Sequence, residues 1–212
     1  MTQPSPPANA AKRYAPATVR NREPIREVLA MVLPASGRAL EIASGTGEHV
    51  VFFAAAFPGI TWRPSDADPE CLASIAAWSA VAGFANLGAP LHLDASRPLW
   101  PVDLGGFDAV LCVNMIHIAP WPACQGLMAG SGRVLKTGGA LVLYGPFKEG
   151  GRHTAPSNAA FDQQLRAANE ACGVRDTADV EAEAAGHGLL LERRVAMPAN
   201  NLSLVFRKQP PS

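Results

Sequence analysis

The chain has 212 residues, of which 48% are hydrophobic, and its eighteen basic and eighteen acidic residues leave no formal net charge. This balance gives no general attraction to nucleic acid or to an anionic membrane, so we expect a small-molecule substrate and neither of those partners. No run approaches the roughly 20 apolar residues of a membrane span, and the cysteines form no Cys-x-x-Cys pair, as suits a reducing compartment. We expect a cytoplasmic protein, monomeric or homodimeric, with a disordered tail over residues 1–11 and one domain over residues 12–208.

Helical and strand patterns alternate along the first two thirds of the chain. Periodic apolar residues predict helices, and short apolar runs predict buried strands. The predicted helices cover residues 20–33, 50–56, 69–81 and 124–135. The predicted strands cover residues 38–42, 60–64, 91–94, 107–114 and 140–144. Five strands joined by crossovers imply a parallel sheet.

The last third of the chain begins with a polar segment over residues 145–157, which is too long for an ordinary connection and is expected to be a functional loop. Helical patterns follow at residues 161–169 and 177–186. Two closing strands at residues 189–197 and 202–207 are joined by four residues, which favours an antiparallel hairpin.

The turn after the first strand is the most informative segment, because residues 40–47 read Leu-Glu-Ile-Ala-Ser-Gly-Thr-Gly. A turn at this end of a parallel strand is the usual ligand crevice of an open α/β sheet. A dinucleotide fingerprint would need a third glycine, whereas Gly45 and Gly47 are followed by Glu48, whose carboxylate disfavours a pyrophosphate. The alternative is a plain turn with a structural Glu41.

The order acid-x-Ala-x-Gly-x-Gly resembles the first motif of class I S-adenosylmethionine-dependent methyltransferases, with Ala43 in place of a glycine. The resemblance implies a Rossmann-like fold with a seven-stranded, mostly parallel sheet, helices on both faces and a C-terminal antiparallel hairpin. It also implies that Glu41 orients the methionine end of the cofactor and that the backbone of Ala43, Ser44, Gly45 and Gly47 packs against it.

The same resemblance assigns roles to residues at later strand ends. Asp66 would hold the ribose hydroxyls, although it could instead cap the next helix, a role that we assign to Asp68. Asp94 and the Ala95 amide would contact the adenine, and Asn114 would contact the methionine end.

The catalytic candidates are His117, His153 and Tyr144. His117 lies in the stretch after the fourth strand, which in class I enzymes is beside the transferable methyl group. A histidine can align a nucleophile and accept its proton at neutral pH. The alternative is a histidine that hydrogen-bonds loop backbone.

The whole chain from Lys12 to Lys208 resembles a narrower family, the bacterial proteins grouped as domain of unknown function 938, with a human methyltransferase-like relative. Ala43 belongs to the pattern of this family. The phrases that carry the resemblance include Lys-Arg-Tyr-Ala-Pro-Ala at 12–17, Glu-Ile-Ala-Ser-Gly-Thr-Gly-Glu-His at 41–49, Asn-Met-Ile-His-Ile at 114–118 and Gly-Arg-His-Thr-Ala-Pro-Ser-Asn at 151–158. The family supplies a cofactor class and no substrate.

The remaining candidates lie near the start of the first helix and in the polar loop. Arg22 could pair with the cofactor carboxylate, although a solvated helix start is the alternative. The substrate-binding candidates are Tyr14, Phe147, Arg152, Thr154, Asn158 and Asn200. The Arg and Lys content of the loop is compatible with an acceptor that carries a carboxylate or phosphate. Ser157 or Asn158 could instead cap the next helix, and Asn200 could only form the hairpin turn.

These features predict an S-adenosylmethionine-dependent methyltransferase that acts on O, N or S of a small molecule and releases S-adenosylhomocysteine. A non-catalytic protein that binds the cofactor is the second hypothesis, and a nicotinamide oxidoreductase is the third. No spacing of histidines and carboxylates indicates a metal site.

Overall fold

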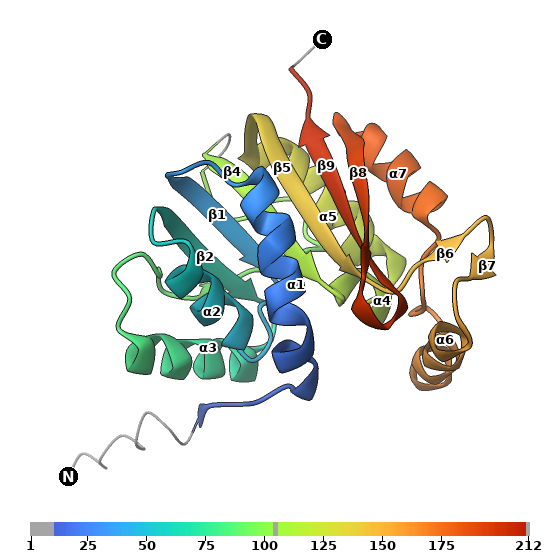
Figure 1. The fold of residues 1–212 in the computed structure, drawn as a ribbon, viewed down its shortest axis with the longest axis horizontal. Helices are drawn as coiled ribbons and strands as arrows, with labels where there is room; N and C mark the ends of the chain where they lie inside the picture. Colours follow the sequence, from blue (N-terminus) through green and yellow to red (C-terminus); the bar gives the residue numbers. More distant parts are fainter. Residues whose placement is uncertain (1–10, 104–105, 211–212) are drawn as a thin grey trace.

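The computed structural model describes residues 11–103 and 106–210, and most of the predicted disordered tail falls on residues 1–10, outside the described residues. A seven-stranded sheet lies between two layers of helices (Figure 1). The strand order is β3-β2-β1-β4-β5-β9-β8. In that order the strands span Leu91–His92, Ile60–Asp66, Gly37–Ile42, Phe107–Val113, Leu135–Gly145, Asn201–Lys208 and Leu189–Met197.

The pairings among β1 to β5 are parallel, whereas β9 is antiparallel to both of its neighbours. The predicted mostly parallel sheet with a closing hairpin is therefore confirmed. Since the strands β1, β2 and β4 end at the same edge, the residues that follow them gather there. In the described part of the chain, no helix is both long enough and apolar enough to cross a membrane.

Helices cover both faces of the sheet (Figure 1). One face carries α1 Pro16–Val32, α2 Glu48–Ala56 and α3 Pro69–Ala82. The other carries α4 Met115–Ile118, α5 Trp121–Val134 and α7 Thr177–Ala185. The segment after β5 forms a small hairpin of β6 Lys148–Glu149 and β7 Arg152–His153, and α6 Pro156–Ala168 stands beside it.

Each central strand contributes to two hydrophobic cores, because successive side chains point to opposite faces. In β4, Ala109 and Leu111 pack with residues of α1 and α2, whereas Val110 and Cys112 pack with residues of α5 and α7. This arrangement explains why the strand reads as a continuous apolar run in the sequence.

Several predicted boundaries are wrong for local reasons. β3 ends at His92, which leaves Asp94 in a loop. β5 begins at Leu135, because the Lys-Thr-Gly-Gly segment forms an irregularity within the ladder to β4. α6 begins at Pro156 with Ala155 at its N-cap position, so the capping role suggested for Ser157 is wrong. The predicted loop contains the β6–β7 hairpin.

The approach of α5 to the loop after β3 gives a prediction. A Cβ on Gly130 would overlap the ring of the buried Trp100. We expect Gly130→Ala to lower the free energy of unfolding by about 1–3 kcal/mol through overpacking, measured by urea denaturation. The control is Gly186→Ala, where the backbone is in the right-handed helical region and a Cβ would meet no atom closer than 3.4 Å. Equal stability of both variants would contradict this packing.

Candidate functional site

The β1–α2 turn has a backbone of alternating left-handed residues. Ala43, Gly45 and Gly47 have φ values of 54°, 58° and 89°. A Cβ on Gly47 would lie 2.8 Å from the Cα of Ile75, whereas a Cβ on Gly45 would meet nothing within 4 Å. The turn is thus packed against α3 at Gly47 and faces open space at Gly45, where a ligand can approach the main chain.

Asp66 at the end of β2 is tied to this turn. Its Oδ2 accepts a hydrogen bond from the Gly45 amide at 2.9 Å, and its Oδ1 accepts one from the Asp68 amide at 3.0 Å. Asp68 in turn accepts from the Glu70 amide at 2.9 Å and occupies the N-cap position of α3, as predicted. Asp66 is therefore free of the capping role and lies beside the open face of Gly45.

Glu41 ends β1 with a buried carboxyl group. Its side chain is 1% exposed, and its Oε2 has no hydrogen-bond partner among the described residues. Burial raises the pKa of Glu41 to about 8, the Ser44 side chain opposes the shift, and the nearby Asp66 adds to it. A buried acceptor without a donor is costly, and a cationic ligand group placed there would satisfy it.

Asp94, Ala95 and Asn114 lie at neighbouring strand ends. Asp94 accepts two hydrogen bonds from Ser96, at 2.9 Å and 2.7 Å, and pairs with Arg97 at 3.5 Å. Asn114 has a φ of 62°, and its amide donates to the Tyr144 carbonyl at 2.8 Å. The structure therefore brings the cofactor-binding candidates of four strand ends to one edge of the sheet.

The segment before α1 crosses this edge and is fastened to it. The Ala15 amide donates to Glu48 Oε2 at 2.6 Å, and the Arg13 amide donates to Ser74 Oγ at 2.8 Å. Ser74 Oγ also donates to the carbonyl of Thr46 within the turn at 2.7 Å. Glu48 thus anchors the N-terminal segment, a role that the sequence analysis missed because its partner is a backbone amide.

Tyr14 and Arg22 both contact helices on the α1–α3 face of the sheet, and the role of Arg22 toward the cofactor carboxylate stays a prediction. Tyr14 is 69% exposed and packs edge-on against Trp78 of α3. Helix α3 and the β6–β7 hairpin lie at opposite ends of the sheet (Figure 1). Arg22 lies within α1, with its guanidinium 4.8 Å from the ring centroid of Phe52. Tyr14 is therefore not gathered with the other substrate-binding candidates.

A buried polar chain connects α1, α2 and the end of β5. The imidazole Nε2 of His49 lies 2.8 Å from Asn21 Oδ1, and the Asn21 side chain lies near Tyr144, where it opposes the rise in the pKa of that hydroxyl. Burial and the nearby Arg22 lower the pKa of His49 to about 4, so its ring is neutral and donates to the Asn21 oxygen. Burial raises the pKa of Tyr144, which keeps its hydroxyl protonated.

His117 is enclosed on all sides. It is 0% exposed, its Nδ1 accepts from the Arg175 amide at 3.2 Å, and its ring meets Phe147 edge-on at 4.8 Å. Burial and the charge of Arg175 lower its pKa to about 3. The single proton of the neutral ring is therefore on Nε2, which has no acceptor among the described residues. This hydrogen bond to the loop backbone is the alternative to a catalytic base that the sequence analysis gave for His117. The role of His117 as a base stays a prediction.

His153 belongs to a charged cluster within the segment after β5. Asp162 is 6% exposed and lies 3.0 Å from Lys148, 3.3 Å from His153 and 3.2 Å from Arg166. Burial raises the pKa of Asp162, but the hydrogen bonds from Lys148 and the Val174 amide and the charges of Lys148 and Arg166 hold that pKa below its usual value. The cluster fastens α6 to the β6–β7 hairpin.

The other candidates of this segment meet the tip of the β8–β9 hairpin. The side-chain amide of Asn158 donates through Nδ2 to Thr154 Oγ1 at 3.0 Å and to the backbone carbonyl of Asn200 at 2.9 Å. Asn158 is buried, whereas Arg152 and Thr154 are exposed. Phe147 is 0% exposed, so it supports the segment from within and presents no surface to a ligand.

A model of the family described as protein of unknown function DUF938 matches residues 12–208. The chain belongs to the DUF938 family. Among solved structures, an O-methyltransferase family protein from Burkholderia thailandensis is 15% identical with a TM-score of 0.76, and the match covers 92% of this chain and 58% of that one. CalO1, a methyltransferase of calicheamicin biosynthesis solved with S-adenosylhomocysteine, is 19% identical with a TM-score of 0.71. This match covers 92% of this chain and 55% of CalO1.

A protein from Galdieria sulphuraria, described as a candidate sarcosine dimethylglycine methyltransferase, is 17% identical with a TM-score of 0.73, and the match covers 94% of this chain and 92% of that one. This DUF938 chain thus spans little more than half of the Burkholderia protein and of CalO1, and nearly all of the Galdieria protein. The likenesses show the Rossmann-like fold of class I methyltransferases.

The buried Glu41 predicts a pH effect on stability. Its folded-state pKa of about 8 exceeds the ordinary value of 4.5. The stabilisation from its proton is therefore complete below pH 4.5 and is lost as the pH rises toward 8. Glu41→Gln removes the titration, so the variant should gain at least about 1 kcal/mol of unfolding free energy over the wild type between pH 5 and pH 8. Denaturant titrations across this range measure the gain, and parallel pH profiles of the two proteins would disprove the shift.

The left-handed Ala43 predicts a stabilising substitution. A non-glycine L-residue in this conformation carries about 1–2 kcal/mol of strain, which a glycine would relieve. The greater conformational entropy of glycine in the unfolded chain cancels about 0.5–1 kcal/mol of that gain. We expect Ala43→Gly to raise the unfolding free energy by about 0.5–1 kcal/mol in thermal or chemical denaturation. Ala39→Gly, within β1, is the matched control and should destabilise. A loss of stability in Ala43→Gly would contradict the strained turn.

Proposed function

We propose that this DUF938 protein is an S-adenosylmethionine-dependent methyltransferase that acts on a small molecule. The observation that carries the proposal is the buried Oε2 of Glu41, which has no hydrogen-bond partner among the described residues, beside a glycine turn whose open face is bordered by Asp66. A ligand with a cationic group at Glu41 and hydroxyl groups at Asp66 satisfies both. S-adenosylmethionine carries an ammonium and a ribose diol at opposite ends of its sulfonium centre.

The residues present fit this cofactor. Glu41 would receive the ammonium end, directly or through water, and the main chain from Ala43 to Gly47 would lie against it. Asp66 uses one lone pair of each oxygen on the Gly45 and Asp68 amides, which leaves acceptor capacity for two hydroxyls. Asp94, exposed at the edge of the crevice, would receive the adenine amino group.

The chain would contribute orientation more than chemistry. The cofactor supplies an electrophilic methyl group, whose in-line transfer requires an aligned nucleophile. Asn114 and Tyr144 are joined through the main chain at the carboxyl ends of β4 and β5, next to the turn. Burial raises the pKa of Tyr144, so its hydroxyl would stay protonated and would donate a hydrogen bond to an acceptor molecule.

Cationic side chains favour an acceptor that carries a carboxylate or phosphate. Lys148 and Arg166 share a single carboxylate, Asp162, which leaves one positive charge there, and Arg152 of the adjacent hairpin is exposed. This excess of positive charge would attract an anionic small molecule to the side of the sheet beyond β5. The acceptor atom, O, N or S, is left open by this argument.

One observation favours the second hypothesis, a protein that binds the cofactor without transferring its methyl group. His117, the base candidate of the sequence, is fully buried and has its pKa lowered to about 3. A binding protein needs no proton acceptor, so a chain that binds S-adenosylmethionine and methylates no small molecule would support this hypothesis.

Calorimetric titration tests the cofactor assignment. We expect binding of S-adenosylmethionine and S-adenosylhomocysteine and none of NAD. Asp66→Asn should weaken S-adenosylhomocysteine at least about tenfold, because a charged acceptor of the diol and of the turn is lost. Asp103→Asn, at an exposed carboxylate that pairs with Arg38 near the start of β1, is the control and should bind normally. Tight binding of NAD with no response to the other two would refute the proposal.

A further inference from the structure

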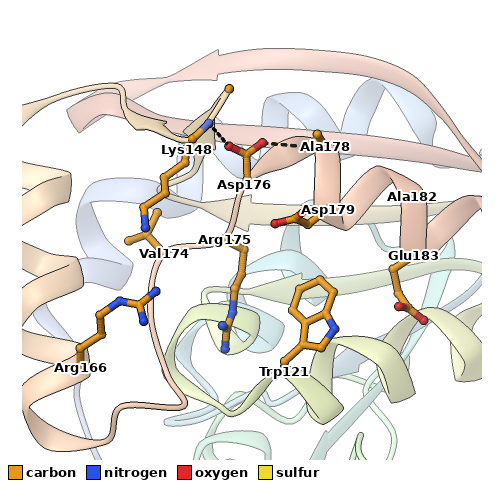
Figure 2. Close-up of a pocket in the computed structure, with 12 residues that line it drawn as sticks. Trp121, Lys148, Arg166, Val174, Arg175, Asp176, Ala178, Asp179, Ala182 and Glu183 are labelled. Carbon is orange, nitrogen blue, oxygen red and sulfur yellow. Dashed lines mark hydrogen bonds between the residues drawn. The ribbon is translucent and has the colours of Figure 1, made fainter.

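A hollow of the molecule lies away from the glycine turn. It is a cleft of about 960 Å³ between the start of α5, α7 and the β6–β7 hairpin (Figure 2). None of its lining residues belongs to the β1–α2 turn or to the ends of β1, β2 and β4. Its volume is that of a small-molecule site.

The two sides of this cleft carry opposite charges. Lys148 and Arg166 stand on the side of the hairpin and α6, whereas Asp179 and Glu183 project from α7 on the other side (Figure 2). Trp121 lies between them, with the Arg175 guanidinium 5.5 Å from the ring centroid. The cleft thus has a positively charged side, a negatively charged side and an aromatic wall between them.

These opposite charges do not neutralise one another. Within the part of the chain that the structure describes, no ion pair joins Lys148, Arg166 or Arg175 to Asp179 or Glu183. Arg166 pairs with Asp162 through Nε, which leaves its terminal nitrogens, and Asp179 has no hydrogen-bond partner there. Lys148 is paired with Asp162 at 3.0 Å, and Glu183 contacts Gln125 and His187. The groups that remain available to a ligand are therefore the terminal nitrogens of Arg166 and the carboxylate of Asp179.

We propose that this cleft is a second binding site, for a small zwitterion of the amino-acid or short-peptide type. The carboxylate of the ligand meets the terminal nitrogens of Arg166, its ammonium group meets Asp179, and its middle lies against Trp121, with Lys148 and Glu183 beside the two ends. Binding here does not require the cofactor, so it is tested separately from cofactor binding, although Lys148 and Arg166 are also the cations proposed to attract an anionic methyl acceptor.

Arg175 connects this cleft to the α4 turn. Its Nε donates to the Ile116 carbonyl at 2.9 Å, and its Nη2 donates to the Ala119 carbonyl at 2.8 Å. The backbone amide of Arg175 donates a hydrogen bond to Nδ1 of His117. A ligand held against Trp121 lies beside Arg175, whose guanidinium is 5.5 Å from that ring centroid, so occupancy of the cleft reaches the turn that follows β4.

The test uses the full chain and free glycine peptides of one to four residues, because this series spans different separations of the two charges. Isothermal titration and amide NMR spectra should show at least one peptide binding with a dissociation constant of about 1 mM or tighter. The same peptide with an acetylated amino end or an amidated carboxyl end should bind at least about tenfold more weakly. Amide signals of residues 116–119 should shift on binding.

Variants locate the site. Asp179→Asn and Arg166→Gln should each weaken binding several-fold, and Asp179→Asn keeps the fold because its side chain is exposed and unpaired in the described structure. Glu27→Gln, at an exposed carboxylate of α1 on the other face of the sheet, is the matched control. The proposal is overturned if no peptide binds, if both capped forms bind as well as the free one, or if Asp179→Asn leaves the affinity unchanged.

Discussion

The hydrogen bond between the Gly45 amide and Asp66 is the interaction on which the candidate site depends. It joins the turn after β1 to the end of β2, and it exists only because the turn adopts left-handed conformations at three alternating positions. Gly47 at the same time allows α3 to approach at Ile75. With the turn fixed on two sides, its remaining side and the buried Glu41 define where a ligand can lie.

Much of the fold could be predicted because its signals are local. The apolar runs of β1, β4 and β5 indicate strands buried on both faces, and Asp68 before Pro69 is a recognisable helix start. The β6–β7 hairpin could not be predicted, since two-residue strands carry no period. The sequence also placed the start of α6 too late, at residue 161. The first turn of this helix is polar, and its N-cap residue, Ala155, gives no capping signal.

The candidate site also has a part that could be predicted from the sequence and a part that could not. Glu41, Asp66 and Asp94 could be placed together from the sequence, because the register of parallel strands brings their ends to one edge. The enclosure of His117 could not, since the amide that fixes its ring belongs to Arg175, 58 positions later. Glu48 and Asn21 were missed as structural residues for the same reason: their partners come from distant elements. Long-range contacts thus decide which candidate side chains remain available to a ligand.

A crystal structure of the protein with S-adenosylhomocysteine tests the central claim most directly. The account predicts the ribose hydroxyls on Asp66, the amino-acid end beside Glu41 and the β1–α2 turn, and the adenine toward Asp94. S-adenosylhomocysteine bound away from the turn, or with its ribose remote from Asp66, would contradict it.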